Sequence, residues 1–254
     1  MYKFLKGFTL AEVLVTLGIV GIIAAITLPA LIQRNNEKST VVKLKKVYSV
    51  MSNAHMQAVN DYGNFDSWGL QKSQENGSED EEAIAASDAG INRYIEIMSK
   101  YLKTVKICKA SDNSCEVWDS YNLAGVKDNS DSYTTRMVLA DGTVIGHIFI
   151  NYPECDGYWG TGKLSYFCGS FKVDLNGSKK PNTYGKDIFE FDIIKSGVIP
   201  AGTFEAADTS FEGKCINYSH RMGGIGCTAW VIMNENMDYL HCTDLSWTGK
   251  TKCK

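Results

Sequence analysis

Cysteines are the side chains of this sequence with the most reactive chemistry, and the chain holds eight of them, all beyond an apolar N-terminal stretch. An even set of closely spaced cysteines in an exported domain is readily satisfied by disulfides, so we expect bridges, with buried free thiols as the alternative. Pairing in sequence order gives the candidates Cys108–Cys115, Cys155–Cys168, Cys215–Cys227 and Cys242–Cys253. Eight cysteines allow about 105 complete connectivities, so the pairing itself stays open.

Neither zinc binding nor catalysis has a matching sequence pattern. No two cysteines stand in the C-x-x-C spacing that lets one turn present two thiolates to zinc. None of the four histidines lies in an H-E-x-x-H or G-x-S-x-G context. They are His55, His147, His220 and His241. We therefore expect no zinc site and no enzyme, although catalytic groups that meet only in the fold would escape this test.

An oxygen-rich stretch between residues 173 and 191 is a candidate calcium site. Asp174, Asn176 and Asp187 stand among glycines, and such turns supply the oxygen ligands that calcium prefers. The stretch departs from an EF-hand loop, because Lys179 and Lys180 crowd it and no glutamate closes it. The alternative is a plain Asn-Gly turn between two strands. We expect no cofactor other than this candidate calcium ion.

The N-terminal apolar run carries most of the functional information. From Phe8 to Ile32 its only ionisable residue is Glu12, and as a helix it would span roughly 37 Å. The run is too long for the apolar core of a cleaved secretory signal, which is about 7 to 15 residues. The sequence therefore predicts a membrane-spanning helix.

Glu12 is unusual because a carboxylate within hydrocarbon is costly and normally faces a partner. Cleavage after Gly7 would give Phe8 a positively charged amino group one helical turn from Glu12, or near Glu12 of a packed neighbour. A carboxylate near a helix start also suits the positive end of the helix dipole. We expect proteolysis to create the counter-charge.

The segment KG followed by FTLAEVLVTLGIVGIIAAITLPAL resembles the cleavage and assembly segment of type IV prepilins and type II secretion pseudopilins. The resemblance extends from Met1 to about Arg34. It implies that Gly7 ends the leader, that Phe8 becomes the N-methylated first residue, and that Glu12 serves methylation and subunit docking. Pro29 falls where this family places a helix-kinking proline.

By this resemblance the chain is expected to be a structural filament subunit. Its partners would be copies of itself, related pilins, prepilin peptidase, an assembly platform in the bacterial inner membrane and, before assembly, the lipid bilayer. The head would lie outside the cytoplasm and later in a periplasmic or surface filament. The alternative is a minor pilin or an anchored adhesin that binds through its C-terminal lobe. The formal net charge of -3 makes nucleic acid an improbable main partner.

The sequence after the N-terminal apolar run predicts further helices and strands. Apolar residues recur at three- and four-residue steps from Val41 to Tyr62, which predicts an amphipathic continuation of the helix. Ile84, Ile91, Ile95, Met98 and Leu102 suit the buried side of a second helix. Strands are expected at residues 134–139, 143–150, 166–175 and 189–194, the first two joined by an Asp-Gly turn.

Together these elements predict an α+β protein whose long N-terminal helix packs on an antiparallel sheet of pilin type. Expected boundaries are a leader at 1–7, a membrane or filament-core helix at 8–34, an amphipathic continuation at 35–62 and an exported head at 63–254. Residues 63–77 are expected to form a loop that exposes Phe65 and Trp68. Residues 215–253 form either a stapled hairpin or a short helix with loops, and their large aromatics are expected in its core.

Overall fold

The computed structural model describes residue 7 and residues 9–73, 81–109, 119–128, 135–216 and 221–253. By its internal contacts the chain divides into two units, Met1–Ser39 and Thr40–Lys254. The second unit is called the head below, and each unit is described by itself.

A single helix, α1 (Leu10–Tyr62), belongs to both units. Within the head, its buried side chains include Val41, Leu44, Met51 and Ala58. The amphipathic continuation expected from the sequence is therefore confirmed. The helix ends at Gly63, whose φ of 80° is costly for other residues and whose amide donates to the carbonyl of Val59 at 2.9 Å.

The head contains a six-stranded antiparallel sheet in the order β1-β4-β5-β6-β7-β8. Its strands are β1 (Thr104–Cys108), β4 (Arg136–Leu139), β5 (Val144–Phe149), β6 (Phe167–Asp174), β7 (Ile188–Ile194) and β8 (Gly197–Pro200). A separate hairpin consists of β2 (Ser120–Tyr121) and β3 (Lys127–Asp128). The four expected strands are present, whereas β1, β8 and the small hairpin were not predicted.

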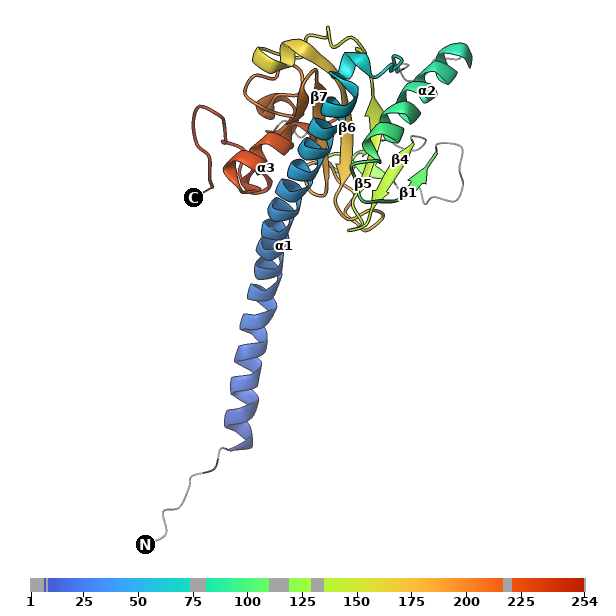
Figure 1. Cartoon of the computed structure of the whole chain (residues 1–254). Helices are drawn as coiled ribbons and strands as arrows, with labels where there is room; N and C mark the ends of the chain where they lie inside the picture. Colours follow the sequence, from blue (N-terminus) through green and yellow to red (C-terminus); the bar gives the residue numbers. More distant parts are fainter. Residues whose placement is uncertain are drawn as a thin grey trace. The chain divides into compact units, whose positions relative to one another are not determined.

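The α+β arrangement is confirmed, because the head's part of α1 packs on one face of this sheet (Figure 1). The ring of Tyr48 stacks on that of Phe191 in β7 with centroids 5.9 Å apart, and Phe191 stacks on Phe171 in β6 at 5.5 Å. A second helix, α2 (Glu81–Met98), adds Tyr94, Ile95 and Met98 to the same core. Ile84, expected on its buried side, is exposed. Residues of both helices and of the sheet thus share one hydrophobic core.

The segment after α1 corrects one expectation. Phe65, in the short helical turn η1 (Phe65–Ser67), and Trp68 are buried rather than exposed. They form an aromatic cluster with His55 of α1 and Tyr94 of α2. The indole of Trp68 donates to the carbonyl of Gly63 at 2.9 Å, so its burial leaves no unpaired donor. Residues 74–77 of the expected loop lie outside the described residues.

The C-terminal segment is a short helix with loops rather than a hairpin. It contains a π-helical turn η3 (Glu212–Ile216), η4 (Ile225–Cys227), α3 (Thr228–Asn234) and η5 (Asp238–Leu240). Trp230 stacks on Phe211 at 4.0 Å, and the Tyr239 hydroxyl donates to the carbonyl of Gly185 at 2.6 Å. Its large aromatics therefore form core, as expected. The remaining helical turn, η2 (Gly162–Tyr166), precedes β6.

Candidate functional site

The start of α1 holds the residues that the sequence singles out for processing and docking. Gly7 is exposed, and Phe8 lies outside the described residues. The backbone amide and the hydroxyl of Thr9 each donate to Oε2 of Glu12 at 2.8 Å. The amide of Glu12 donates to the Thr9 hydroxyl at 3.2 Å. Thr9 and Glu12 thus cap the helix reciprocally.

This capping box gives Glu12 a structural role that we did not predict, although the T-x-x-E spacing signals it. The carboxylate already has partners within its own chain. Both hydrogen bonds from Thr9 end on Oε2, and within the described residues no hydrogen bond reaches Oε1. One carboxylate oxygen therefore remains able to accept from a further donor.

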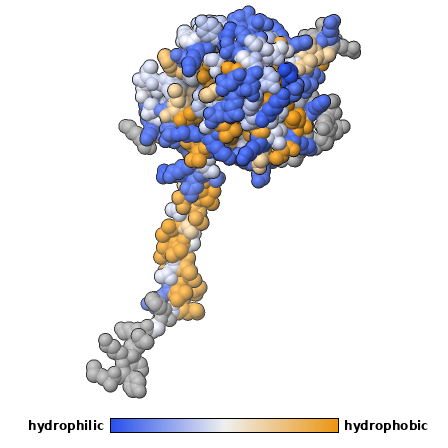
Figure 2. Space-filling model, in the orientation of Figure 1, coloured by the Kyte–Doolittle hydropathy of each residue, from blue (hydrophilic) through white to orange (hydrophobic). Residues whose placement is uncertain are grey.

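The first unit presents an apolar surface with few polar interruptions. By length and composition α1 is long and apolar enough to cross a membrane. The Thr16 and Thr27 hydroxyls donate to carbonyls one turn back, those of Glu12 and Ile23, at 2.9 Å. Figure 2 shows hydrophobic residues covering this part of the helix. The helix continues through Pro29 without interruption.

Disulfides tie the head together. The pairs Cys155–Cys168, Cys215–Cys227 and Cys242–Cys253 are present, three of the four candidate bridges. Cys108 is also disulfide-bonded, and its expected partner Cys115 lies outside the described residues. Such bridges are typical of proteins in oxidising, extracytoplasmic compartments.

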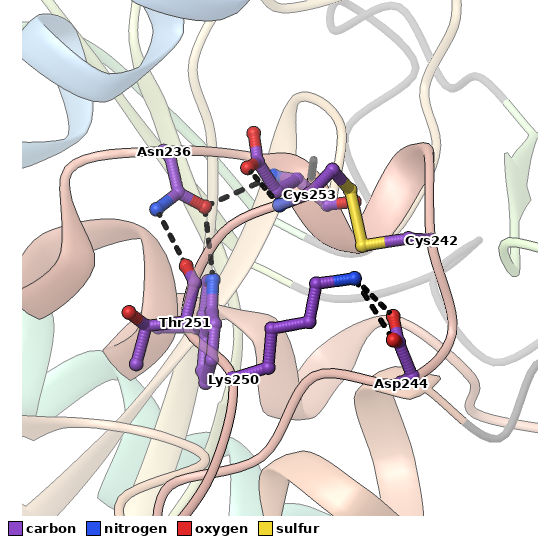
Figure 3. Close-up of a disulfide and its surroundings, with 8 residues drawn as sticks. Asn236, Cys242, Asp244, Lys250, Thr251 and Cys253 are labelled. Atoms are coloured by element: carbon purple, nitrogen blue, oxygen red, sulfur yellow. Dashed lines mark hydrogen bonds and ion pairs between the residues drawn. A yellow bond between two sulfur atoms is a disulfide. The ribbon is translucent and has the colours of Figure 1, made fainter.

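The Cys242–Cys253 bridge closes a hydrogen-bonded C-terminal loop (Figure 3). Asn236 accepts from the Trp230 indole at 3.1 Å and donates to the carbonyl of Thr251 at 3.2 Å. The Cys253 amide donates to Asp238 at 2.7 Å. The chain's last described residues are thus fixed against the buried Trp230.

The calcium candidates lie together, but their oxygens bind the chain itself. Asp174 accepts from the amides of Asn176 and Gly177, at 3.0 and 2.8 Å. Asp187 accepts from two backbone amides and from the Asn176 side chain. Burial raises the pKa of Asp187 despite these bonds. Among the described residues no three His, Cys, Asp or Glu side chains converge as for a metal. Asn176 and Gly177 lie in a longer loop, residues 175–187, that joins β6 and β7, rather than in a plain turn between the strands.

A buried ionisable network on the sheet was not predicted. Lys172 donates to the Tyr184 hydroxyl at 2.7 Å, and that hydroxyl donates to Asp128 at 2.6 Å. Lys172 lies opposite Glu190 in the β6–β7 ladder, and Asp192 is fully buried. Burial, and then the charge of Glu190, raises the pKa of Asp192 well above its ordinary value. Asp128 comes from the β2–β3 hairpin, Tyr184 from the loop before β7, and Lys172 from β6, so only the tertiary fold brings them together.

These features define a class: an α+β protein in which one long apolar helix leads into a disulfide-stapled head. Residues 30–217 match the model of a family of unknown function, DUF6613, and the chain belongs to that family. The match begins after Pro29 and includes the whole sheet. No curated protein and no solved structure matches the chain.

Proposed function

We propose that this protein is a structural subunit of a filament resembling a type IV pilus or a type II secretion pseudopilus. A prepilin peptidase would cut between Gly7 and Phe8 and methylate Phe8, and the subunit would assemble through its N-terminal helix. The observation that carries this proposal is one carboxylate, Glu12, at the start of a helix whose next 20 residues, 13–32, carry no charge.

The apolar part of α1 needs a dry environment both before and after assembly. Leu10, Ile22 and Ile26 are each at least 65% exposed in the single chain. Lipid covers such side chains first, and packed helices of neighbouring subunits cover them in a fibre. Because lipid is as apolar as leucine, this transfer relies on close packing and on polar contacts rather than on the hydrophobic effect.

Glu12 supplies the polar contact in this proposal. Its Oε2 is bound to Thr9, while Oε1 is available to the amino group that cleavage exposes on Phe8 of the same or a neighbouring subunit. An unpartnered carboxylate within hydrocarbon is costly, so an ion pair at Glu12 favours incorporation of the subunit into the filament.

The proposed location of the protein in the cell follows from the apolar helix of the first unit and the disulfides of the head. The apolar helix would sit in the bacterial inner membrane with the head outside the cytoplasm, where its disulfides form, and an assembly platform would move the subunit into the filament. An anchored adhesin that binds through C-terminal aromatics is not favoured, because Trp230 and Tyr239 are buried in the head.

Substitutions at both members of the capping box test the proposal. Glu12→Ala should leave membrane insertion intact and strongly reduce incorporation into sheared filaments. Thr9→Val removes the hydroxyl of the cap but keeps the carboxylate, so it should retain most of the filament yield. Equal losses in both variants would mean that Glu12 acts only as a helix cap. Normal filaments from Glu12→Ala would overturn the docking role.

A further inference from the structure

The head carries an exposed aromatic projection. Among the described residues the exposed large aromatic side chains are Tyr158, Tyr166 and Phe204, with exposed fractions of 67, 60 and 74%. All three come from residues 152–166 and 201–208, here called the aromatic lobe. Because aromatic side chains are enriched at protein interfaces, three exposed rings on one lobe favour a binding surface.

The aromatic lobe is held rigidly. The Cys155–Cys168 bridge closes it, and the half-buried ring of Trp159 stacks on Phe167 at 4.6 Å. The amide of Thr161 donates to the carbonyl of Glu205, and that of Ala207 to Trp159, both at 3.0 Å. A rigid display of aromatic rings loses little conformational entropy on binding.

The head also carries a groove of about 400 Å³ beside α1. Its apolar lining includes Val50, Ala54 and Leu139, and its charged lining residues are Lys46, Lys103 and Asp141. Val50 is 37% exposed. Lys46 pairs with Asp141 at 2.8 Å, so the three charges sum to +1.

The two surfaces are complementary in charge. The aromatic lobe contains four acidic residues, Glu154, Asp156, Glu205 and Asp208, and one basic residue, Lys163, which gives a net charge of -3. An acidic lobe with projecting rings thus matches an apolar groove of net positive charge. The same charge disfavours an anionic lipid or nucleic acid as the partner of the lobe.

The two surfaces lie at different places on the sheet. The groove contacts Leu139 at the end of β4, whereas the lobe packs on Phe167 at the start of β6, Ile194 at the end of β7 and Ile199 in β8. Four strand spacings from β4 to β8 correspond to roughly 20 Å across the sheet, and the length of β6 adds roughly 20 Å along it. The lobe therefore cannot occupy the groove of its own chain.

We propose that the aromatic lobe of one copy docks into the α1 groove of a second copy. This inference rests on the proposed function and adds to it a contact between heads. Because the two surfaces differ, the contact is heterologous: every copy keeps one lobe and one groove for the next neighbour. Contacts of this kind generate open helical polymers, whereas two-fold contacts stop at dimers.

The contact is tested with one variant for each surface in the full chain, purified in detergent micelles. Phe204→Glu disables the lobe and Val50→Glu disables the groove, each at an exposed position. Met233→Glu, at an exposed apolar position of α3, is the matched control. Chemical cross-linking reports the ladder of oligomers, and an unchanged urea unfolding midpoint shows that each variant is folded.

Wild type and Met233→Glu should give ladders of dimers, trimers and longer species, while each disabled variant alone should lose about tenfold or more of its cross-linked product. A one-to-one mixture of the two disabled variants should recover dimers without trimers, because one intact lobe meets one intact groove. A mixture that gives no more cross-linked dimer than either variant alone overturns the proposal. A wild-type chain that stays monomeric overturns it too, whatever else its lobe binds.

Failure of this contact is distinguishable from failure of the proposed function. Glu12→Ala leaves the head unchanged, so it should keep the cross-linked ladder in micelles while it loses filament incorporation. A normal filament yield from Glu12→Ala refutes the docking role of Glu12 alone. A wild-type chain that gives the cross-linked ladder but enters no filament refutes the proposed function alone. Filaments that depend on Glu12 but form normally from Phe204→Glu refute the head contact alone.

Discussion

His55 gives the clearest quantitative prediction about the head. It is fully buried on α1, and neither ring nitrogen has a hydrogen-bond partner within the described residues. Phe65 and Trp68 lie against it with ring centroids 6.1 and 5.1 Å away. Burial among these rings lowers the pKa of His55 from 6.5 to about 4, because it disfavours the charged imidazolium.

The size of the pH effect on the stability of the head follows from the difference in proton binding between the folded and unfolded states. Between pH 6.5 and about 4 the unfolded chain binds a proton at His55 that the folded head does not bind. The contribution to stability is therefore complete above pH 6.5 and is lost as the pH falls toward 4. One pKa unit corresponds to about 1.4 kcal/mol, so the full loss is about 3 kcal/mol, of which about 2 kcal/mol is lost by pH 5.

His55→Phe removes this proton while keeping an aromatic ring in the cluster. Urea unfolding of the full chain in detergent, followed by tryptophan fluorescence, gives the free energy of unfolding at pH 7.5 and pH 5. Wild type should lose about 2 kcal/mol more than His55→Phe between these pH values. His241→Phe, at an exposed histidine, should behave like wild type. Equal pH dependence in wild type and His55→Phe would refute the linkage reasoning.

Two further predictions concern the head. Replacing Cys155 and Cys168 by serine opens a bridge across 13 residues, so the urea midpoint should fall by an amount equivalent to about 3 kcal/mol; an unchanged midpoint would contradict this. Despite partial burial, hydrogen bonds from Lys46 and Thr143 hold the pKa of Asp141 at about 2. The stability that the Asp141 carboxylate contributes to the folded head is therefore lost as the pH falls from 3.8 toward 2. Because the ion pair is partly exposed, Lys46→Ala should lower stability at pH 7 by only about 1 kcal/mol or less, measured by the same unfolding assay.

Periodic elements of the fold were predictable from sequence. The three- and four-residue steps from Val41 to Ala58 identified the buried stripe of α1, because a packed helix must repeat its apolar side chains at that spacing. The Asp141-Gly142 turn identified the β4–β5 hairpin, since Gly142 adopts a φ of 82° there.

Non-periodic features escaped prediction for physical reasons. Phe65 and Trp68 stand in a polar loop sequence, and only the tertiary contact with His55 and Tyr94 buries them. β1 is an edge strand with three exposed residues, so it lacks the alternation that marks a half-buried strand.

In the candidate site, too, some features were predictable from the sequence and others depend on tertiary contacts. The isolated carboxylate in an apolar run was visible in the sequence, as were the closely spaced cysteine pairs. The T-x-x-E spacing also indicates the Thr9–Glu12 cap, which we did not predict. The aromatic lobe was not predictable, because exposure of Tyr158 and Phe204 depends on how two distant segments pair.

The most direct measurement of the central claim is the mass of the N-terminal peptide of the protein isolated from cell membranes and from sheared fibres. A filament subunit of the proposed kind should begin at Phe8 and carry one additional methyl group on its amino nitrogen. A chain that retains Met1, or that begins at any residue other than Phe8, would contradict the account.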